Sequence, residues 1–179
     1  MAASAASADD RRPDKTTLTI MTLNGEFLWD GVRKEEGRVN FAWKRNKDEA
    51  EDHMADVAAL VKAASPDIVN MVEVENLKAL KTFNTKFLSG QGYKAYLVNG
   101  RDSTTGQDVG LLTRIDPEGN RIARSDKKGK SGGVSKSVSK NYFAKLQVGG
   151  KKIALVGLHF LARPDDTSRK LPRQAACTR

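Results

Sequence analysis

The chain has 179 residues, a length that suits one domain or part of a larger one. It carries 31 lysines and arginines against 22 acidic residues, so its formal net charge is +9. A basic chain favours polyanionic partners such as nucleic acid, phosphorylated molecules or acidic membrane surfaces, although many soluble proteins are simply basic. No run approaches the ~18 apolar residues of a membrane helix. The single cysteine, Cys177, excludes an internal disulfide and a zinc site built on cysteines.

The first fifteen residues contain small and charged side chains but no apolar stretch. They therefore do not form an intact signal peptide, and they are either the remnant beyond a removed signal or a simple tail. We expect residues 1–15 to be a disordered tail and residues 16–179 to form a partial domain. A secreted or periplasmic location is compatible with this sequence, which does not fix the compartment.

The first half of the chain predicts alternating strands and helices. The β-branched run TLTIMTLN, Thr17 to Asn24, predicts a strand, and the irregular segment after it predicts a long loop. From Lys47 to Ala64 the apolar residues recur with the period of a helix. Pro66 ends that helix, and the apolar run DIVNMVEVEN, Asp67 to Asn76, predicts a buried strand.

The second half predicts one more helix and then strands only. Asn76 is the expected N-cap of a helix that stops at Gly90. Residues 116–140, rich in Gly, Ser and Lys, predict an exposed flexible loop. Four strands are predicted, with a hairpin turn at Gly149-Gly150 between the last two; they span residues 94–99, 108–114, 141–148 and 152–160. This order is typical of an α/β or α+β sandwich rather than of regular βαβ alternation.

Polar side chains stand at the ends of several apolar strands: Asn24, Glu73 with Glu75, Asp108 and His159. Burying such groups is costly unless they bind something or each other, so a cluster of them is a hypothesis for a functional site. Each also has a structural explanation, because a glutamate could pair with a lysine, a histidine could be a core residue, and an asparagine or aspartate could begin a turn or cap a loop. In a regular strand Glu73 and Glu75 would point the same way.

Three other residues receive a simpler interpretation. We expect His53 on the polar surface of the first helix. Trp29 and Trp43 lie in the long loop, where they either plug the core, which we favour, or form a rim that stacks on bases. The chain contains no dinucleotide-binding or P-loop motif.

Four segments together resemble, in order and rough spacing, the motifs of the endonuclease/exonuclease/phosphatase superfamily, whose best-known member is deoxyribonuclease I. MTLNGEFLWDG is similar to the first motif, PDIVNMVEVEN to the metal-binding strand, GQDVGLLTR to the next strand, and IALVGLHF to the strand that runs into a histidine. The match spans residues 17–160. The resemblance implies an α/β (α+β) fold, a deoxyribonuclease I-like two-sheet sandwich flanked by helices and incomplete at its C-terminus.

The resemblance also implies roles for individual residues. Glu73 matches the family's divalent-metal ligand, with Mg²⁺ or Mn²⁺ as the implied cofactor, and Asn24 matches the asparagine that supports metal and phosphate. His159 matches the histidine that contacts the scissile phosphate, and Asp108 the acid that orients it. Glu75 has no firm role in the family and is expected to support the site from behind.

The sequence departs from the family's pattern in several places. Gly157 stands where the family has Asn or Thr, and Val72 stands where it has Gln. The family continues with an Asp-x-Asn motif and a final Asp-His pair, and neither follows His159 here. The resemblance therefore implies the N-terminal portion of such a domain, and the 179 residues alone are expected to be inactive.

The resulting hypothesis is a metal-dependent phosphodiester hydrolase, a nuclease in the first instance, acting on nucleic acid or another phosphoester. Lys127, Lys128 and Lys130 are expected to contact the substrate backbone. One alternative is an inositol-phosphate or phospholipid phosphatase. A second alternative is a non-catalytic basic binding module that keeps the fold.

Overall fold

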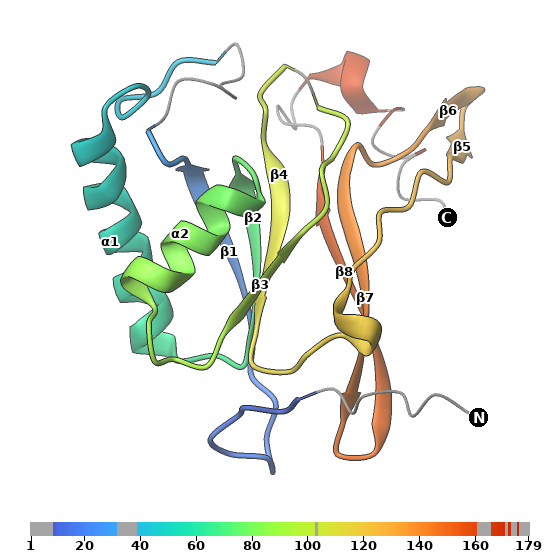
Figure 1. Cartoon of the computed structure of the whole chain (residues 1–179). Helices are drawn as coiled ribbons and strands as arrows, with labels where there is room; N and C mark the ends of the chain where they lie inside the picture. The colour runs from blue at the N-terminus through green and yellow to red at the C-terminus, as the bar shows by residue number, and fades with distance from the viewer. Residues whose placement is uncertain are drawn as a thin grey trace, which may run out of the picture.

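The computed structural model describes residues 9–31, 39–102, 104–160 and 166–170, together with Pro172 and Ala175. These residues form three layers: two helices, a four-stranded sheet and a two-stranded sheet (Figure 1). In the part of the chain so described, neither helix combines the length and apolarity needed to cross a membrane.

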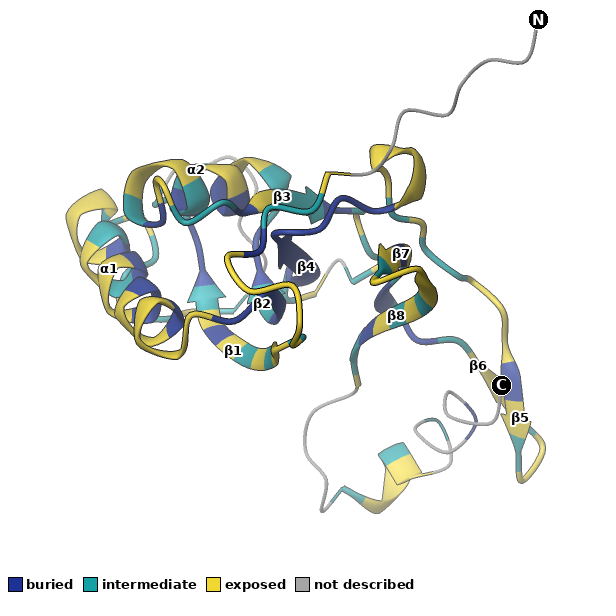
Figure 2. Ribbon diagram, turned by 90° about the horizontal axis from the view of Figure 1, so that it is seen from below, coloured by how far each residue is buried: buried dark blue, intermediate teal, exposed yellow. Residues whose placement is uncertain are grey.

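Both helices begin where the sequence predicts, and the first also ends at the expected residue, whereas the second ends at Phe87, before Gly90. The helix α1, Lys47–Ala64, has Asn46 as its N-cap, whose side chain accepts from the backbone N–H of Glu49, and it ends at Ser65 in a left-handed conformation. The helix α2, Leu77–Phe87, is capped by Asn76 in the same way, through the N–H of Ala79. Such caps satisfy backbone donors that the first helical turn leaves unpaired. The buried faces of α1 and α2 pack on the four-stranded sheet, and their exposed faces point to solvent (Figure 2).

The four-stranded sheet has the order β1-β2-β4-β3. Its strands are β1 Ile20–Leu28, β2 Ile68–Val74, β3 Lys94–Leu97 and β4 Asp108–Thr113. The strands β1 and β2 are parallel and joined through α1, whereas β4 runs antiparallel to both of its neighbours. The first strand was expected at residues 17–24, so it lies further along the chain than its β-branched run suggested.

The second sheet is the hairpin of β7, Lys140–Val148, and β8, Lys151–His159. Gly149 and Gly150 form its turn with φ of 55° and 79°, as the Gly-Gly pair predicts. A second apolar cluster fills the space between the two sheets, with contributions from Ile68, Leu111, Tyr142 and Leu146. The prediction of a two-sheet sandwich from the sequence is therefore confirmed.

Two segments differ from the sequence interpretation. The expected flexible loop at 116–140 contains the short helix η1, Glu118–Asn120, and a hairpin of β5, Gly129–Ser131, with β6, Val134–Lys136. The expected disordered tail at 1–15 is also wrong in its second half, because Asp10 bridges Ile115 and the Arg11 side chain donates to the Gly92 carbonyl. Residues 1–8 of that tail lie outside the described residues.

The strand directions bring the predicted site residues to one end of the sandwich. The strands β1, β2 and β8 end there, and β4 and β7 begin there, at the top of Figure 1. Every strand-end polar residue identified in the sequence belongs to one of these strands or directly follows it.

Candidate active site

Two adjacent backbone irregularities mark this end of the four-stranded sheet. The pairing of β1 with β2 is regular up to Asn24 opposite Val72 and resumes only at Leu28 opposite Val74. In the interrupted segment of β2, Glu73 takes a left-handed φ of 62°. A left-handed conformation at a non-glycine residue costs about 1–3 kcal/mol and persists where the surroundings hold it, often at functional sites. A bulge of this kind re-aims side chains.

The bulge turns Glu73 toward the second sheet. Met71 packs in the cluster under the helices, and regular alternation would place Glu73 on the same face. Instead Glu73 Oε1 lies 3.7 Å from Nε2 of His159 on β8, and the two side chains are 17% and 19% exposed. The structure therefore brings together Glu73 and His159 from different sheets.

Glu75 has a different partner and is nearly completely buried. Its Oε2 accepts a hydrogen bond from the backbone N–H of Asp30 at 3.1 Å, and its own N–H donates to the Leu28 carbonyl. Thus Glu75 ties the end of β2 to the segment after β1. The expectation that Glu73 and Glu75 would point the same way is wrong, because the bulge breaks the alternation between them.

Asp108 lies beside these residues, opposite Val74 in the pairing of β2 with β4. It is buried, and its Oδ1 accepts from the Gly100 N–H at 2.6 Å. Burial raises the pKa of Asp108 to about 6, although the Gly100 hydrogen bond acts in the opposite direction. Asp108 and His159 both lie in the described part of the chain, and no hydrogen bond joins them. The expected role of Asp108 in orienting His159 therefore stays a prediction.

Lys140 belongs to the same end of the sandwich, which no sequence pattern indicates. It is the partner of His159 in the β7–β8 pairing and is 7% exposed. Its Nζ donates to Oδ2 of Asp102 at 3.2 Å and lies 3.5 Å from Oε1 of Gln107. A lysine in a basic run gives no sequence signal of burial, because the partners that bury it come from a separate loop.

The surroundings keep His159 neutral near neutral pH. Burial, together with the positive charge of Lys140, lowers the pKa of His159 to about 4, and Asp102 partly opposes the change. The contact between Glu73 and His159 is therefore not an ion pair at neutral pH. A neutral imidazole can accept a proton or donate a hydrogen bond to a phosphate oxygen.

The oxygen donors at this end fit a hard divalent cation. Glu73 supplies a partly exposed carboxylate, and Asn24 on the neighbouring strand supplies an exposed amide whose Oδ1 accepts from the Glu26 N–H at 2.9 Å. The described residues contain no group of three His, Cys, Asp or Glu placed to hold a metal ion. Mg²⁺ tolerates such a site, because it keeps several waters and usually binds through one or two carboxylates together with substrate phosphate.

The aromatic residues near Asn24 divide into two roles. Trp29 is fully buried and plugs the core, as favoured from the sequence. Trp43 is half-buried, stacks on His53 with ring centroids 3.9 Å apart, and donates from Nε1 to the Phe27 carbonyl. The expectation of His53 as a surface residue is wrong, since its Nε2 lies 2.8 Å from the Gly25 carbonyl oxygen.

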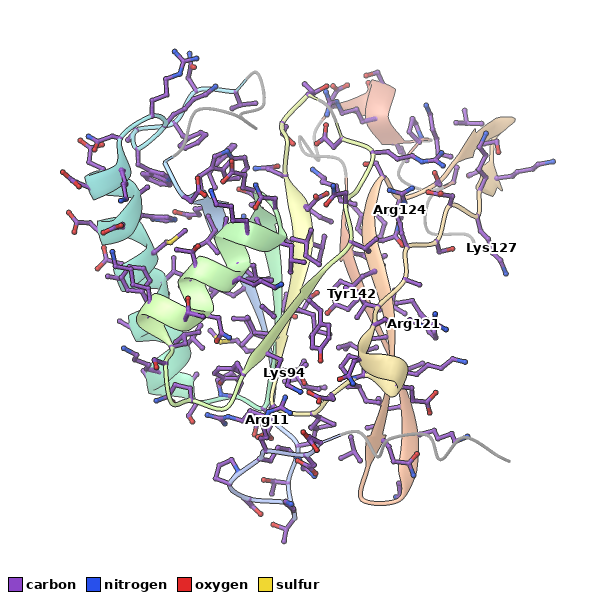
Figure 3. All side chains as sticks on the ribbon, viewed as in Figure 1. Arg11, Lys94, Arg121, Arg124, Lys127 and Tyr142 are labelled. Carbon is purple, nitrogen blue, oxygen red and sulfur yellow. The ribbon has the colours of Figure 1, made fainter. Side chains whose placement is uncertain are left out.

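A basic flank adjoins this end of the molecule. Lys127, Lys128 and Lys130 are exposed in the segment that leads into and forms β5. Arg101 and Arg124 both pair with Asp126 nearby. Figure 3 shows Arg124 and Lys127 on the side of the molecule that carries β5 and β6.

Comparison with known proteins identifies the fold. No protein-family model and no curated protein matches the chain. Among solved structures, it is similar to ANGEL2, described as a 2′,3′-cyclic phosphatase, with a TM-score of 0.50 and 14% identity over 89% of this chain and 46% of that one. It is also similar to the human Nocturnin catalytic domain, with a TM-score of 0.49 and 16% identity over 89% of this chain and 55% of that one. A third similar structure is an endonuclease/exonuclease/phosphatase family protein from Bacteroides thetaiotaomicron, with a TM-score of 0.45 and 17% identity over 80% of this chain and 49% of that one.

The chain has the deoxyribonuclease I-like fold, as its sequence motifs predict. It spans about half the length of the solved structures that it matches. At this level of identity the likeness concerns the fold alone.

Proposed function

We propose that this chain is part of a metal-dependent phosphodiester hydrolase that acts on nucleic acid. The observation that carries the proposal is the approach of Glu73 and His159 to 3.7 Å across two sheets, produced by a bulge at Glu73 and adjoined by Asn24. Core packing alone does not require a strained backbone that directs a carboxylate at a neutral, partly buried histidine. This arrangement therefore supports a functional site.

Each residue of the site has a task in this proposal. Glu73 and Asn24 would hold Mg²⁺ or Mn²⁺, which when bound neutralises charge on the phosphate and on the leaving oxygen. Neutral His159 donates a hydrogen bond to a phosphate oxygen or accepts a proton. Glu75 fixes the end of β2 by accepting a hydrogen bond from the Asp30 N–H. Asp108 is a buried acid next to the site that accepts from the Gly100 N–H.

The basic flank favours a polymeric substrate over a small one. Lys127, Lys128 and Lys130 are exposed in and just before β5, which belongs to a different hairpin from the strands that carry Glu73 and His159. A nucleic-acid backbone presents a row of phosphates that such a flank can follow. A phosphatase of inositol phosphates or phospholipids would use the same metal and histidine, and a binding module would use the flank alone.

The test replaces the proposed metal ligand. Glu73→Gln keeps the side-chain shape and removes its charge, and Glu118→Gln, at an exposed glutamate of η1, is the matched control. We expect Glu73→Gln to abolish Mn²⁺ binding by the 179-residue chain, measured by calorimetric titration, while circular dichroism stays unchanged. Since the 179 residues alone are expected to turn over little substrate, cleavage is measured in the longest form of the protein that its gene encodes.

Cleavage rates on DNA, RNA and an inositol phosphate decide among the alternatives. We expect Glu73→Gln to lower DNA cleavage by far more than tenfold, that is by more than ~1.4 kcal/mol in the barrier. A Glu73→Gln rate within tenfold of the parent would sink the metal assignment. Faster turnover of the inositol phosphate would favour the phosphatase, and binding of DNA without cleavage would favour the binding module.

A further inference from the structure

The backbone directly after Asn24 is bent and strained. Asn24 is the last residue of β1 in regular register with β2, and the next two non-glycine residues, Glu26 and Phe27, have φ of 46° and 61°. Two successive left-handed residues cost about 1–3 kcal/mol each and persist only where the surroundings hold them. Because the side chain of Asn24 accepts from the N–H of Glu26, the bend also fixes where the Asn24 amide lies.

Two aromatic side chains from outside β1 hold this bend on either side of Glu26. Nε2 of His53, on α1, lies 2.8 Å from the carbonyl oxygen of Gly25, and Nε1 of Trp43 donates to the carbonyl of Phe27 at 2.8 Å. The His53 and Trp43 rings stack, with centroids 3.9 Å apart and planes 17° from parallel. A carbonyl oxygen can only accept, so Nε2 of His53 carries the proton in this contact.

The helix α1 does not need His53 for its own packing. Its buried face consists of Ala50, Met54, Val57, Ala58 and Val61, which pack against the sheet. His53 is half-buried beside that face and directs one hydrogen bond at the bend. A purely apolar residue would fill the same space without holding the Gly25 carbonyl.

We propose that His53 and Trp43 form a clamp that positions Asn24 for the phosphate and metal site. Both are positioning residues, since they act through the backbone of residues 25–27 and do not reach the reacting atoms. The link to metal and phosphate rests on the proposed function, whereas the placement of the Asn24 side chain does not.

The experiment compares three variants of the 179-residue chain. His53→Phe keeps a ring that can stack on Trp43 and removes the donor to Gly25. His53→Gln keeps a donor and removes the ring, and Asp56→Ala, at an exposed position of the same helix, is the control. The first measurement is hydrogen exchange at the Glu26 amide, which reports the hydrogen bond to Asn24 directly. The second measurement is Mn²⁺ affinity.

In His53→Phe we expect exchange at the Glu26 amide to accelerate by more than tenfold, with amides of α2 and β4 unchanged. We expect Mn²⁺ affinity to fall by at least fivefold. His53→Gln should restore part of both effects, and Asp56→Ala should match the parent. A residue that only stabilised the fold would accelerate exchange in all elements together, and the conservative variant would not restore the Glu26 amide selectively.

Three results would overturn the clamp: unchanged exchange at the Glu26 amide, uniform acceleration across the chain, or the failure of both His53 variants to fold. Failure of the proposed function has a separate signature. If the parent chain binds no Mn²⁺ but the Glu26 amide responds as expected, the clamp stands and the metal site falls. If Glu73→Gln abolishes Mn²⁺ binding and His53→Phe leaves it unchanged, the clamp does not act on the site.

Discussion

At the scale of single residues, burial sets the charge states at the end of the sandwich. Asp108 and His159 are both pushed toward their neutral forms, with the pKa of Asp108 raised to about 6 and that of His159 lowered to about 4. Lys140 stays close to both, paired with Asp102. Under the proposed function, Glu73, the partly exposed carboxylate beside the neutral His159, is the ligand of the cation.

The first prediction at this scale concerns Asp108. Its folded pKa of about 6 lies above the ordinary 3.8, so the folded chain binds more protons between these values. The stability that Asp108 contributes is therefore present below about pH 4 and is lost as the pH rises through about 6. Asp108→Asn keeps an acceptor for the Gly100 N–H and removes this titration. We expect it to raise the free energy of unfolding at neutral pH by about 1–3 kcal/mol.

Urea unfolding of Asp108→Asn and of the parent chain, followed across this pH range, checks the prediction. The two curves should diverge as the pH rises from about 4 to about 7. Parallel curves would show that Asp108 is not held in its neutral form by burial.

Sequence reasoning found the residues whose signal is local and missed those whose partners are distant. Glu73 and His159 stand out because each interrupts or ends an apolar run, and the structure places them together. His53 and Lys140 sit in polar stretches, and their contacts with Gly25 and Asp102 are made by segments far along the chain. No pattern within a single window of sequence encodes such contacts.

At the scale of elements, capping and turn residues predict where the helices begin and where the β7–β8 hairpin turns, but they do not reveal the short strands. Asn46 and Asn76 cap α1 and α2 as expected, and Gly149-Gly150 turns the β7–β8 hairpin. The Gly-Gly pair at Gly132-Gly133 also forms a hairpin turn, but its flanking strands β5 and β6 are each three residues long and mostly polar, so they carry no strand pattern. A Gly-Gly pair is compatible with a hairpin turn, but strands on either side of it can be predicted only where apolar and polar residues alternate.

The second prediction concerns the packing of β7 on β8 at Gly157. A Cβ added there would lie 2.1 Å from Cε1 of Tyr142 and 2.4 Å from Oδ1 of Asn70. Tyr142, labelled in Figure 3, thus fills the space that a side chain at position 157 would need. We expect Gly157→Ala to destabilise the chain by about 1–3 kcal/mol through overpacking.

A double-mutant cycle with Tyr142→Ala provides the control. Tyr142→Ala alone loses a fully buried ring and should also destabilise, by roughly 3–5 kcal/mol. If the two changes compete for the same space, the double variant should be more stable than the sum of the single effects predicts. Simple additivity, measured by urea unfolding, would contradict the account.

The third prediction concerns the segment at residues 9–12. Arg11 donates to Oδ1 of the buried Asp116 at 2.6 Å, and Lys94 donates to Oδ2 at 2.5 Å. Burial raises the pKa of Asp116, but these hydrogen bonds outweigh burial and hold it below its ordinary value. Removing residues 1–12 leaves a buried carboxylate with one cation instead of two.

We expect that truncation to lower the free energy of unfolding at neutral pH by about 1–3 kcal/mol. Removal of residues 1–8 is the matched control, because it leaves both contacts of Asp116 intact. Equal thermal midpoints for the parent and both truncations would show that the segment at 9–12 adds nothing to stability.

At the scale of the whole molecule, the sequence indicates the class of fold but not the pairing of strands. Apolar runs and their order suffice for a two-sheet sandwich, and the resemblance to the superfamily extends this to a particular fold. The order β1-β2-β4-β3 and the bulge at Glu73 depend on contacts between segments that no local pattern records. Regular alternation, the best local rule, gave the wrong direction for Glu73 because tertiary packing overrode it.

The last prediction concerns the distribution of charge over the molecule. The net charge of +9 alone would attract any polyanion, whereas the proposed function assigns backbone contacts to one flank, at Lys127, Lys128 and Lys130. Binding through defined phosphate contacts makes the logarithm of affinity fall linearly with the logarithm of salt concentration, with a slope of about −0.9 per contact for duplex DNA. Changing the three lysines of the flank to glutamine should therefore flatten the slope by roughly two to three units.

The charge-matched control changes Lys47, Lys62 and Lys81 to glutamine. These lysines are exposed on α1 and α2, in the layer opposite the β7–β8 sheet (Figure 1). Both triple variants lose the same net charge, so a response to overall charge would flatten their slopes equally. Fluorescence anisotropy with a labelled duplex, titrated at several salt concentrations, separates the two cases. Equal slopes in the two variants would mean that the flank is a solvated surface and that DNA responds only to the total charge of the chain.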